Sequence, residues 1–234
     1  MESVSGQGSR PRFLIADDHK IFAETLQGYL ERSFTVIGLV QDGRALVSEA
    51  TRLRPDLIVV DVGMPLLNGL DAALRIKKQA PKTKFVFLTM HNDPNLAAAA
   101  LELGPVGFIL KHSGGQELMK AIDHVLRGKP YLTGTLKPED WIEAKARAQQ
   151  FSKDMTARQR DVIQLLAEGR PLKDIAGILN VSIKTVEFHK HQIQKVFNLR
   201  SNADLVLFAV KRGLVSLPQE TSSPGRPGRH GHSA

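Results

Sequence analysis

The feature that most constrains the fold is the regular alternation of two hydrophobic periods in the first half of the chain. Five short segments rich in Val, Ile, Leu and Phe read as strands, namely 13–17, 34–40, 56–61, 84–89 and 107–111. Helical patterns follow them at 19–32, 43–53, 68–79, 94–103 and 114–127. Strands that alternate with helices favour right-handed crossovers and a parallel sheet covered on both faces. We therefore predict a doubly wound (βα)5 α/β domain over residues 11–128.

The second half of the chain has no convincing strand signal. Residues 129–153 are polar and predict a linker that is partly helical, because Pro138 suits the first turn of a helix. Residues 154–216 predict a small all-α domain, and residues 217–234, rich in Pro, Gly and Ser, predict a disordered tail. The expected helices of the small domain are 156–168, 172–179, 182–197 and 202–214, and their expected caps are Gly169, Ser182 and either Ser201 or Asn202.

Composition excludes several classes of protein. The chain of 234 residues is 42% hydrophobic and 24% charged, which is typical of a soluble globular protein. It has no apolar run that would span a membrane, no signal-peptide pattern at its start and no cysteine, so we expect a cytoplasmic protein without thiolate chemistry. The net charge of +8 indicates a polyanionic partner, and residues 154–216 carry 10 Lys/Arg against 6 Asp/Glu.

Charged and polar side chains stand where four of the predicted strands end. The first strand ends at Asp17 and Asp18, the third at Asp61, the fourth at Thr89 and the fifth at Lys111. One Asp after a strand is most often a turn former or a helix cap. Ligands of open α/β sheets, however, bind at the carboxyl ends of the strands, and the strand order 2-1-3-4-5 brings these four ends together. The set therefore predicts one site.

The chemistry of this set indicates phosphoryl transfer. Three crowded carboxylates repel one another unless a cation lies between them. Mg²⁺ suits that position because it takes a few carboxylate oxygens and keeps room for waters and a phosphate. A carboxylate beside the metal can attack phosphorus and form an aspartyl phosphate. Lys111 would then pair with the phosphoryl charge, and the Thr89 hydroxyl would donate a hydrogen bond to it.

The motifs LIADDH, VVDVGMP, LT and GFILKHS resemble those of the receiver domains of two-component response regulators, over residues 12–128. The resemblance implies that Asp61 is the phosphoacceptor and that a sensor histidine kinase supplies the phosphoryl group. It also implies a Mg²⁺ site and a pair of phosphoryl-sensing side chains. The implied metal ligands are Asp18, Asp61, the Gly63 carbonyl and, through a water molecule, Asp17. The implied phosphoryl-sensing residues are Thr89 and Lys111.

Members of this family commonly carry a switch aromatic on the fifth strand, and Phe108 stands at that position. A plain core role for Phe108 is an equally good interpretation.

Two positions depart from the family pattern. Pro105 stands where a small residue is more common and stiffens the loop before the fifth strand. Met90 is bulkier than usual and restricts access to the phosphoryl group. Neither change removes a chemical group, so competence for phosphorylation is expected.

The segment 182–197 predicts an amphipathic helix with one face rich in basic and amide groups. Val186, Ile193, Val196 and Phe197 give it an apolar side, and between residues 182 and 200 four Lys/Arg stand against one Glu. Such a helix fits the major groove of DNA. Taken alone, a solvated amphipathic helix is the commoner interpretation of a stretch of this kind.

The wider motif, T-x-R-Q-R-D-V-I-x-L-L-A-E-G followed by K-D-I-A-x-x-L-x-V-S-x-K-T-V-E-x-H, resembles the helix-turn-helix domain of the LuxR/NarL/FixJ type, over residues 153–215. The resemblance makes 182–197 the recognition helix and 202–214 a dimerisation helix, although a core role alone is the other interpretation of the latter. The implied DNA contacts are Lys184, Glu187, Phe188 and His191 toward the groove and Thr185, Lys190 and Lys195 toward phosphates; the implied dimer contacts are Leu205, Phe208 and Ala209.

We therefore expect a phosphorylation-switched transcriptional regulator of the NarL/FixJ type that binds double-stranded DNA as a homodimer. Its catalysis would be limited to its own phosphotransfer and dephosphorylation, so it is not expected to be an enzyme. Two alternatives remain open. One is a helix-turn-helix regulator that works without phosphorylation. The other is a Mg²⁺-dependent aspartyl phosphohydrolase, which Gly63 disfavours because the second carboxylate of a D-x-D pair is missing.

Overall fold

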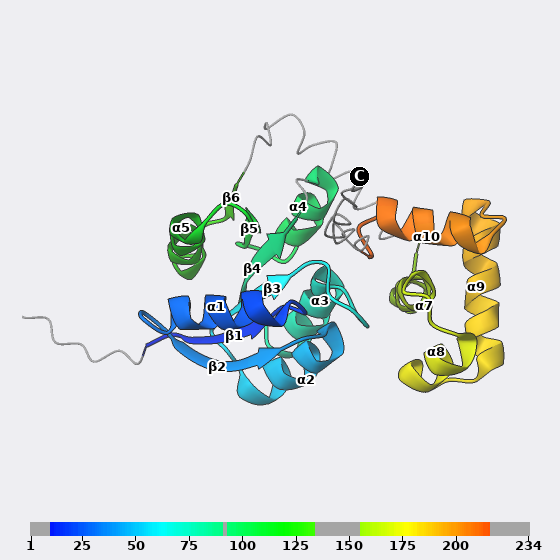
Figure 1. The fold of residues 1–234 in the computed structure, drawn as a ribbon, viewed down its shortest axis with the longest axis horizontal. Coiled ribbons are helices and arrows are strands. Elements are labelled where there is room, and N and C mark those ends of the chain that lie inside the picture. Colours follow the sequence, from blue (N-terminus) through cyan, green and yellow to red (C-terminus); the bar gives the residue numbers. More distant parts are fainter. Residues whose placement is uncertain (1–9, 91–92, 134–154, 216–234) are drawn as a thin grey trace, which may run out of the picture.

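The computed structural model describes residues 10–90, 93–133 and 155–215. Parallel strands form one sheet in the order β2-β1-β3-β4-β5-β6 (Figure 1). The strands are β1 (Arg12–Ala16), β2 (Thr35–Val40), β3 (Leu57–Asp61), β4 (Lys84–Thr89), β5 (Gly107–Leu110) and β6 (Tyr131–Leu132). The order of the first five strands confirms the predicted doubly wound sheet.

Helices cover both faces of this sheet. They are α1 (Lys20–Leu30), α2 (Gly43–Leu53), α3 (Gly69–Gln79), α4 (Pro94–Leu101) and α5 (Gly115–Leu126). Successive strand residues point to opposite faces, so Leu14 enters the core beneath α2, α3 and α4, while its neighbour Phe13 enters the core beneath α1 and α5. Burial on both faces explains why the central strands are apolar at nearly every position.

The sheet differs from the prediction by one short strand. β6 pairs with β5 in parallel, with Gly107 opposite Tyr131 and Phe108 opposite Leu132. The sequence places Tyr131 and Leu132 in the linker, because two residues are too few to show the alternation that marks a strand. The remainder of the predicted linker, residues 134–153, and the predicted tail, residues 217–234, lie outside the described residues.

The second part of the described chain is all-helical, with α7 (Ala157–Ala167), α8 (Leu172–Leu179), α9 (Ile183–Phe197) and α10 (Asn202–Lys211). Thr156 and Ser201 form capping boxes, and the Ser182 side chain accepts from the Thr185 amide. Gly169, with a φ of 78°, follows the end of α7. The four helices enclose a third core, which confirms the small all-α domain. Within the described ranges, no helix has the length and apolar character that a membrane span requires.

Gly43 is a position where the fold leaves no room for a side chain. A methyl group there would lie 1.8 Å from the Leu67 carbonyl oxygen, whereas one at Gly28 in α1 would meet no described atom within 4 Å. We predict that Gly43→Ala lowers the free energy of unfolding by about 2 kcal/mol or more, because the backbone must shift. Gly28→Ala is the matched control and should raise it by about 0.5 kcal/mol. Urea denaturation measures both variants, and equal stabilities would contradict the prediction.

Candidate functional site

The strand ends that carry the predicted site residues are neighbours at one edge of the sheet. Asp17 follows β1, Asp61 is the last residue of β3, Thr89 is the last residue of β4 and Lys111 follows β5. The strand order places β1, β3, β4 and β5 next to one another. Asp17, Asp61 and Thr89 are all buried, with exposed fractions of 0%, 5% and 4%. The structure therefore brings the four residues together, as the sequence predicts.

Lys111 lies between two buried carboxylates. Its Nζ donates a hydrogen bond to Oδ2 of Asp61 at 2.8 Å and lies 2.8 Å from Oδ2 of Asp17. Burial by itself would lower the pKa of this ammonium, but the Asp61 and Asp17 carboxylates outweigh burial and raise the pKa above its usual value. The Nζ atom also lies 5.1 Å from the centre of the Phe22 ring. Lys111 is therefore charged at neutral pH and neutralises one of the two carboxylates.

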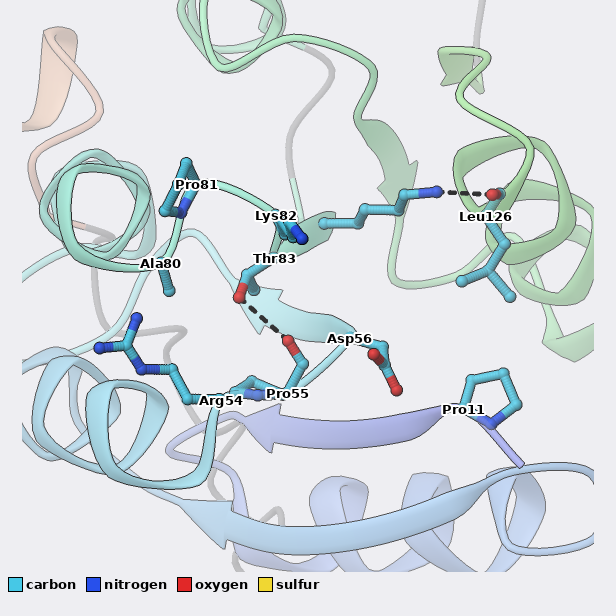
Figure 2. A pocket seen from close by; sticks show the side chains of 10 residues that line it. Pro11, Arg54, Pro55, Asp56, Ala80, Pro81, Lys82, Thr83 and Leu126 are labelled. Carbon is cyan, nitrogen blue, oxygen red and sulfur yellow. Dashed lines mark hydrogen bonds between the residues drawn. The ribbon is translucent and has the colours of Figure 1, made fainter. Parts of the chain in front are cut away.

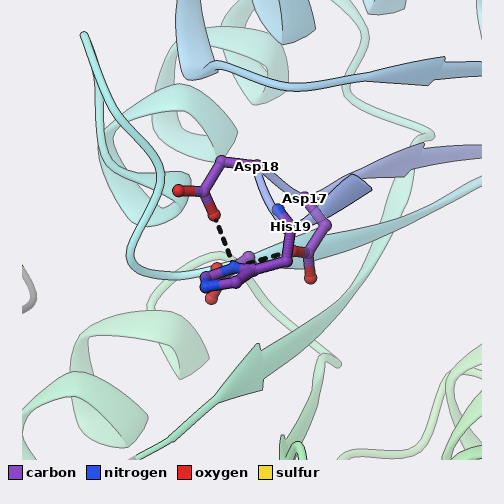
Figure 3. Close-up of side chains that lie close together, drawn as sticks. Asp17, Asp18 and His19 are labelled. Carbon is purple, nitrogen blue, oxygen red and sulfur yellow. Dashed lines mark hydrogen bonds and ion pairs between the residues drawn. The ribbon is translucent and has the colours of Figure 1, made fainter. Parts of the chain in front are cut away.

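Asp17 and Asp61 belong to a larger acidic cluster beside Lys111. Asp17, Asp18, His19 and Asp61 offer ligand atoms that all lie within 4.8 Å of one another. Figure 3 shows the carboxylates of Asp17 and Asp18 beside the His19 ring. Nδ1 of His19 is 2.9 Å from Oδ1 of Asp18 and 3.3 Å from Oδ1 of Asp17. His19 is not among the residues predicted from the sequence, where its only signal is its place directly after two Asp residues.

The cluster fits a divalent cation that prefers oxygen ligands. Asp17 and Asp61 supply buried carboxylates and Asp18 an exposed one. Oδ2 of Asp17 is buried, and its partner is Nζ of Lys111 at 2.8 Å, an ammonium that it shares with Asp61. One ammonium cannot neutralise three carboxylates, so the cluster keeps a negative charge that a bound cation would offset.

The loop after β3 and the middle of β5 complete the surroundings of Asp61. The Gly63 amide donates a hydrogen bond to Oδ1 of Asp61 at 3.1 Å. Phe108 is buried in the core beneath α2, α3 and α4, a position that agrees with both interpretations of this residue. Met90 is 43% exposed directly after Thr89, so its side chain lies at the surface beside the site.

The predicted recognition helix, α9, has the two sides that the sequence indicates. Val186 and Ile193 are fully buried in the helical domain, whereas Phe188 is 58% exposed. The predicted DNA contacts that are exposed are Lys184, Glu187, Phe188, His191 and Lys195, and those that are half-buried are Thr185 and Lys190. None of these seven described residues belongs to the core, so the whole predicted set is accessible to a ligand.

The predicted dimer contacts on α10 need correction. Leu205 and Ala209 are buried in the core of their own domain, so in this structure they cannot contact a second chain. Phe208 is half-buried and packs against Phe197, with ring centres 4.6 Å apart. Leu207, which is 54% exposed, is an apolar residue of α10 that does face outward. Helical periodicity groups apolar residues on one side, but it does not tell whether that side meets the domain core or another chain.

A pocket lies at the opposite edge of the sheet, near the amino ends of the strands (Figure 2). The Thr83 hydroxyl donates to the Pro55 carbonyl at 3.0 Å, and Nζ of Lys84 donates to the Leu126 carbonyl. These two polar side chains therefore hydrogen-bond to backbone carbonyls that border the pocket. No predicted site residue lines it, and it is separate from the acidic cluster.

Comparison with known proteins gives the family. The chain matches the family model of the response regulator receiver domain over residues 13–123, and that of bacterial regulatory proteins of the luxR family over residues 153–209. It is 33% identical over 215 residues to the oxygen regulatory protein NreC of Staphylococcus epidermidis, with 87% of this chain and 99% of the relative covered. It is 31% identical to the uncharacterized transcriptional regulatory protein YxjL of Bacillus subtilis, with 87% and 97% covered.

Solved structures agree with these matches. The RcsB response regulator of Salmonella typhimurium is 25% identical, with a TM-score of 0.60 and with 88% of this chain and 99% of that chain covered. RcsB from Salmonella enterica serovar Typhimurium, solved on promoter rprA with the phosphomimetic BeF3−, is 26% identical, with a TM-score of 0.57 and coverage of 86% and 98%.

The fold and the site define a class of signalling protein in which a receiver domain with an acidic cluster precedes a helix-turn-helix domain. The order of these domains along the chain, the carboxylates and lysine at the strand ends, and the matches over both domains all agree. The chain belongs to the response regulators, with a receiver domain followed by a LuxR-family DNA-binding domain.

Lys111→Met would remove the cation between Asp17 and Asp61 and leave two buried carboxylates close together. We predict a loss of about 3 kcal/mol in the free energy of unfolding at neutral pH, because breaking a buried ion pair leaves an uncompensated charge. Lys120→Met on the exposed side of α5 is the control, with an expected change below about 0.5 kcal/mol. Urea unfolding in metal-free buffer measures both, and similar deficits would contradict the pairing.

Proposed function

We propose that a sensor histidine kinase phosphorylates Asp61 in the presence of Mg²⁺ and thereby switches this regulator between two states of DNA binding. The observation that carries the proposal is the meeting of Asp17, Asp61, Thr89 and Lys111 at adjacent strand ends. The RcsB structure solved on promoter DNA with BeF3− supports the same combination of a phosphoryl-responsive receiver and a DNA reader. The receiver would act catalytically on itself alone, in its own phosphorylation and dephosphorylation.

The acidic cluster is the proposed Mg²⁺ site. Asp18, Asp61 and the Gly63 carbonyl would bind the ion directly, and Asp17 would act through a water molecule. When bound, the ion neutralises carboxylate charge and orients the oxygens of the incoming phosphoryl group. The closeness of the ligand atoms of Asp17, Asp18 and Asp61 and the net negative charge of the cluster support this assignment.

Asp61 is the proposed nucleophile. One of its carboxylate oxygens forms a bond to phosphorus while the bond from phosphorus to a histidine nitrogen of the kinase breaks. The electron pair stays on that nitrogen, which takes up a proton from water. Nζ of Lys111 lies 2.8 Å from Oδ2 of Asp61 before the reaction. After the transfer it forms an ion pair with a phosphoryl oxygen. Thr89, the last residue of β4, donates a hydrogen bond from its hydroxyl to a phosphoryl oxygen.

The proposed response passes from the receiver to α9. Phosphorylation biases the surface around Thr89 and Phe108 and favours a homodimer, with Leu207 an exposed apolar position on α10 available to a partner chain. A dimer places two recognition helices in successive turns of the major groove. The residues proposed to face base edges are Lys184, Glu187, Phe188 and His191, and those proposed to face phosphates are Thr185, Lys190 and Lys195.

Phosphorylation is tested with acetyl phosphate as a small donor. We expect wild-type protein with Mg²⁺ to gain one phosphoryl group by intact mass, and Asp61→Asn to gain none, because the amide is not a nucleophile. Asp123→Asn on exposed α5 is the matched control and should label like the wild type. A chelator of Mg²⁺ should suppress labelling of the wild type. Labelling that persists in Asp61→Asn would exclude this residue as the acceptor.

DNA binding is tested by separating base contacts from phosphate contacts. We expect Lys190→Ala to weaken binding to all sequences alike and to reduce the slope of log K against log salt by about one, because one phosphate contact is lost. Phe188→Ala should leave the slope unchanged and cost roughly 1–3 kcal/mol at a preferred base pair only. Fluorescence anisotropy over a salt series measures both. Identical salt slopes and identical sequence preferences in the two variants would contradict the assigned roles.

A further inference from the structure

The pocket at the amino ends of the strands is built from four separate segments of the receiver domain (Figure 2). They are the residue before β1, the turn between α2 and β3, the turn between α3 and β4, and the end of α5. The cavity measures about 650 Å³, which is within the range of pockets that hold small organic molecules. The chemistry of its lining indicates what it would bind.

Hydrogen bonds between these segments fix the shape of the pocket. The Arg12 amide donates to Oδ2 of Asp56 at 2.7 Å, and the Lys84 amide donates to the Asp56 carbonyl at 3.0 Å. Three of the four segments also contribute a proline, whose ring restricts the backbone. These residues are Pro11, Pro55 and Pro81. The pocket is therefore preformed, and a ligand would not have to order it on binding.

The lining of the pocket carries an excess of positive charge. Its cations are Arg54, Lys82 and Lys84, and the one carboxylate among its described residues is that of Asp56. Within the part of the chain that the structure describes, none of the three cations forms an ion pair. An ammonium has three donors and a guanidinium has five, so these side chains keep donors for a ligand. The lining therefore favours an anion.

A fourth cation stands directly behind the pocket. Nζ of Lys77 donates to the Thr83 carbonyl at 3.1 Å. Burial lowers the pKa of this ammonium, and the positive charge of Lys84 lowers it further. The cations around Thr83 therefore repel one another, and a bound anion would relieve that repulsion.

Arg54 has a backbone conformation that residues other than glycine rarely adopt. It ends α2 in the left-handed region, with φ 50° and ψ 61°. Glycine or asparagine would end the helix in this way at a lower cost. The Arg54 guanidinium donates to the Gln79 carbonyl across the pocket wall, which fixes its position. Because strained positions of this kind cluster at ligand sites, an arginine here is a second indication of binding.

The anion that fits this pocket is small and is not a DNA duplex. The helical domain contacts the receiver beyond the carboxyl end of β3, where Glu168 and Gln164 accept from the Leu66 and Asn68 amides. Figure 1 shows α9 still farther from the sheet, behind α7. DNA held by α9 would therefore lie on the other side of the receiver from the pocket.

We propose that this pocket binds a nucleoside phosphate. Arg54, Lys82 and Lys84 would form charge-assisted hydrogen bonds with the phosphate oxygens. Oδ1 of Asp56 has no hydrogen-bond donor among the described residues, and it would accept from the ribose hydroxyls. The three proline rings and Leu126 would pack against the base. A bare phosphate would gain from the cations alone and would be repelled by Asp56.

The test is a titration of the ¹⁵N-labelled full chain with ADP, followed through its amide resonances. Mg²⁺ is left out, so that no metal carries phosphate to the acidic cluster. We expect saturable shifts of the Asp56, Lys82 and Thr83 amides, with a dissociation constant below about 1 mM. Pyrophosphate and adenosine each present one part of ADP, and each should bind roughly tenfold more weakly or worse.

Two substitutions separate the pocket from general charge attraction. Lys82→Glu reverses a cation of the lining and should weaken ADP binding roughly tenfold or more. Lys78→Glu is the matched control, because it changes the net charge equally at an exposed lysine that does not line the pocket. It should weaken binding less than about threefold.

A third substitution separates ligand binding from stability. Arg54→Gly removes the guanidinium but suits the left-handed backbone, so it should weaken ADP binding without lowering the Tm. Lys82 is exposed, so Lys82→Glu tests the site independently of any change in stability that Arg54→Gly causes.

The outcomes are distinct. Shifts confined to the pocket, with ADP binding lost in Lys82→Glu and kept in Lys78→Glu, support the proposal. Shifts on α9 in their place, or equal losses in the two lysine variants, would show attraction to net charge alone and overturn it. Pyrophosphate that binds as tightly as ADP overturns it too, as does the lack of saturable shifts up to about 10 mM ADP. None of these measurements depends on phosphorylation of Asp61.

Discussion

The ion pair that holds Lys111 against Asp17 and Asp61 is the interaction on which the receiver site depends. It places one cation and two carboxylates in a buried position where none of them would be stable alone. Such an arrangement contributes little to stability compared with apolar packing, but it changes sharply when charge is added. A phosphoryl group on Asp61 would draw Lys111 to itself, and that redistribution is the physical basis of the proposed switch.

The position of Asp61 in the sheet places the proposed phosphorylation site close to the DNA-binding domain along the chain of contacts. Asp61 is the last residue of a fully buried strand, and the loop of residues 62–68 begins directly after it. Met64, Leu66 and Asn68 of this loop are hydrogen-bonded through their backbone to Gln164 and Glu168 of α7. A short stretch of backbone therefore connects Asp61, the proposed phosphoacceptor, with the neighbouring domain.

Much of the fold is predictable because its signals are local. Apolar strands alternating with helices indicate a sheet buried on both faces, and Ser182 and Ser201 mark helix starts by the hydrogen bonds that their side chains make. Predictions fail where the signal is short or has two explanations. β6 has only two residues, and Leu205 with Ala209 forms an apolar stripe that fits either a core or a dimer interface.

The sequence by itself determined which chemical groups stand at the strand ends, because the period of two and the connection rules fix where parallel strands finish. It also determined which face of α9 is polar. Only the tertiary structure decided that Gln164, Glu168 and Asp161 meet the receiver, since polar residues on a helix look the same in sequence whether they face water or another domain. Burial and partner choice arise from contacts between segments far apart in the chain, which local patterns do not encode.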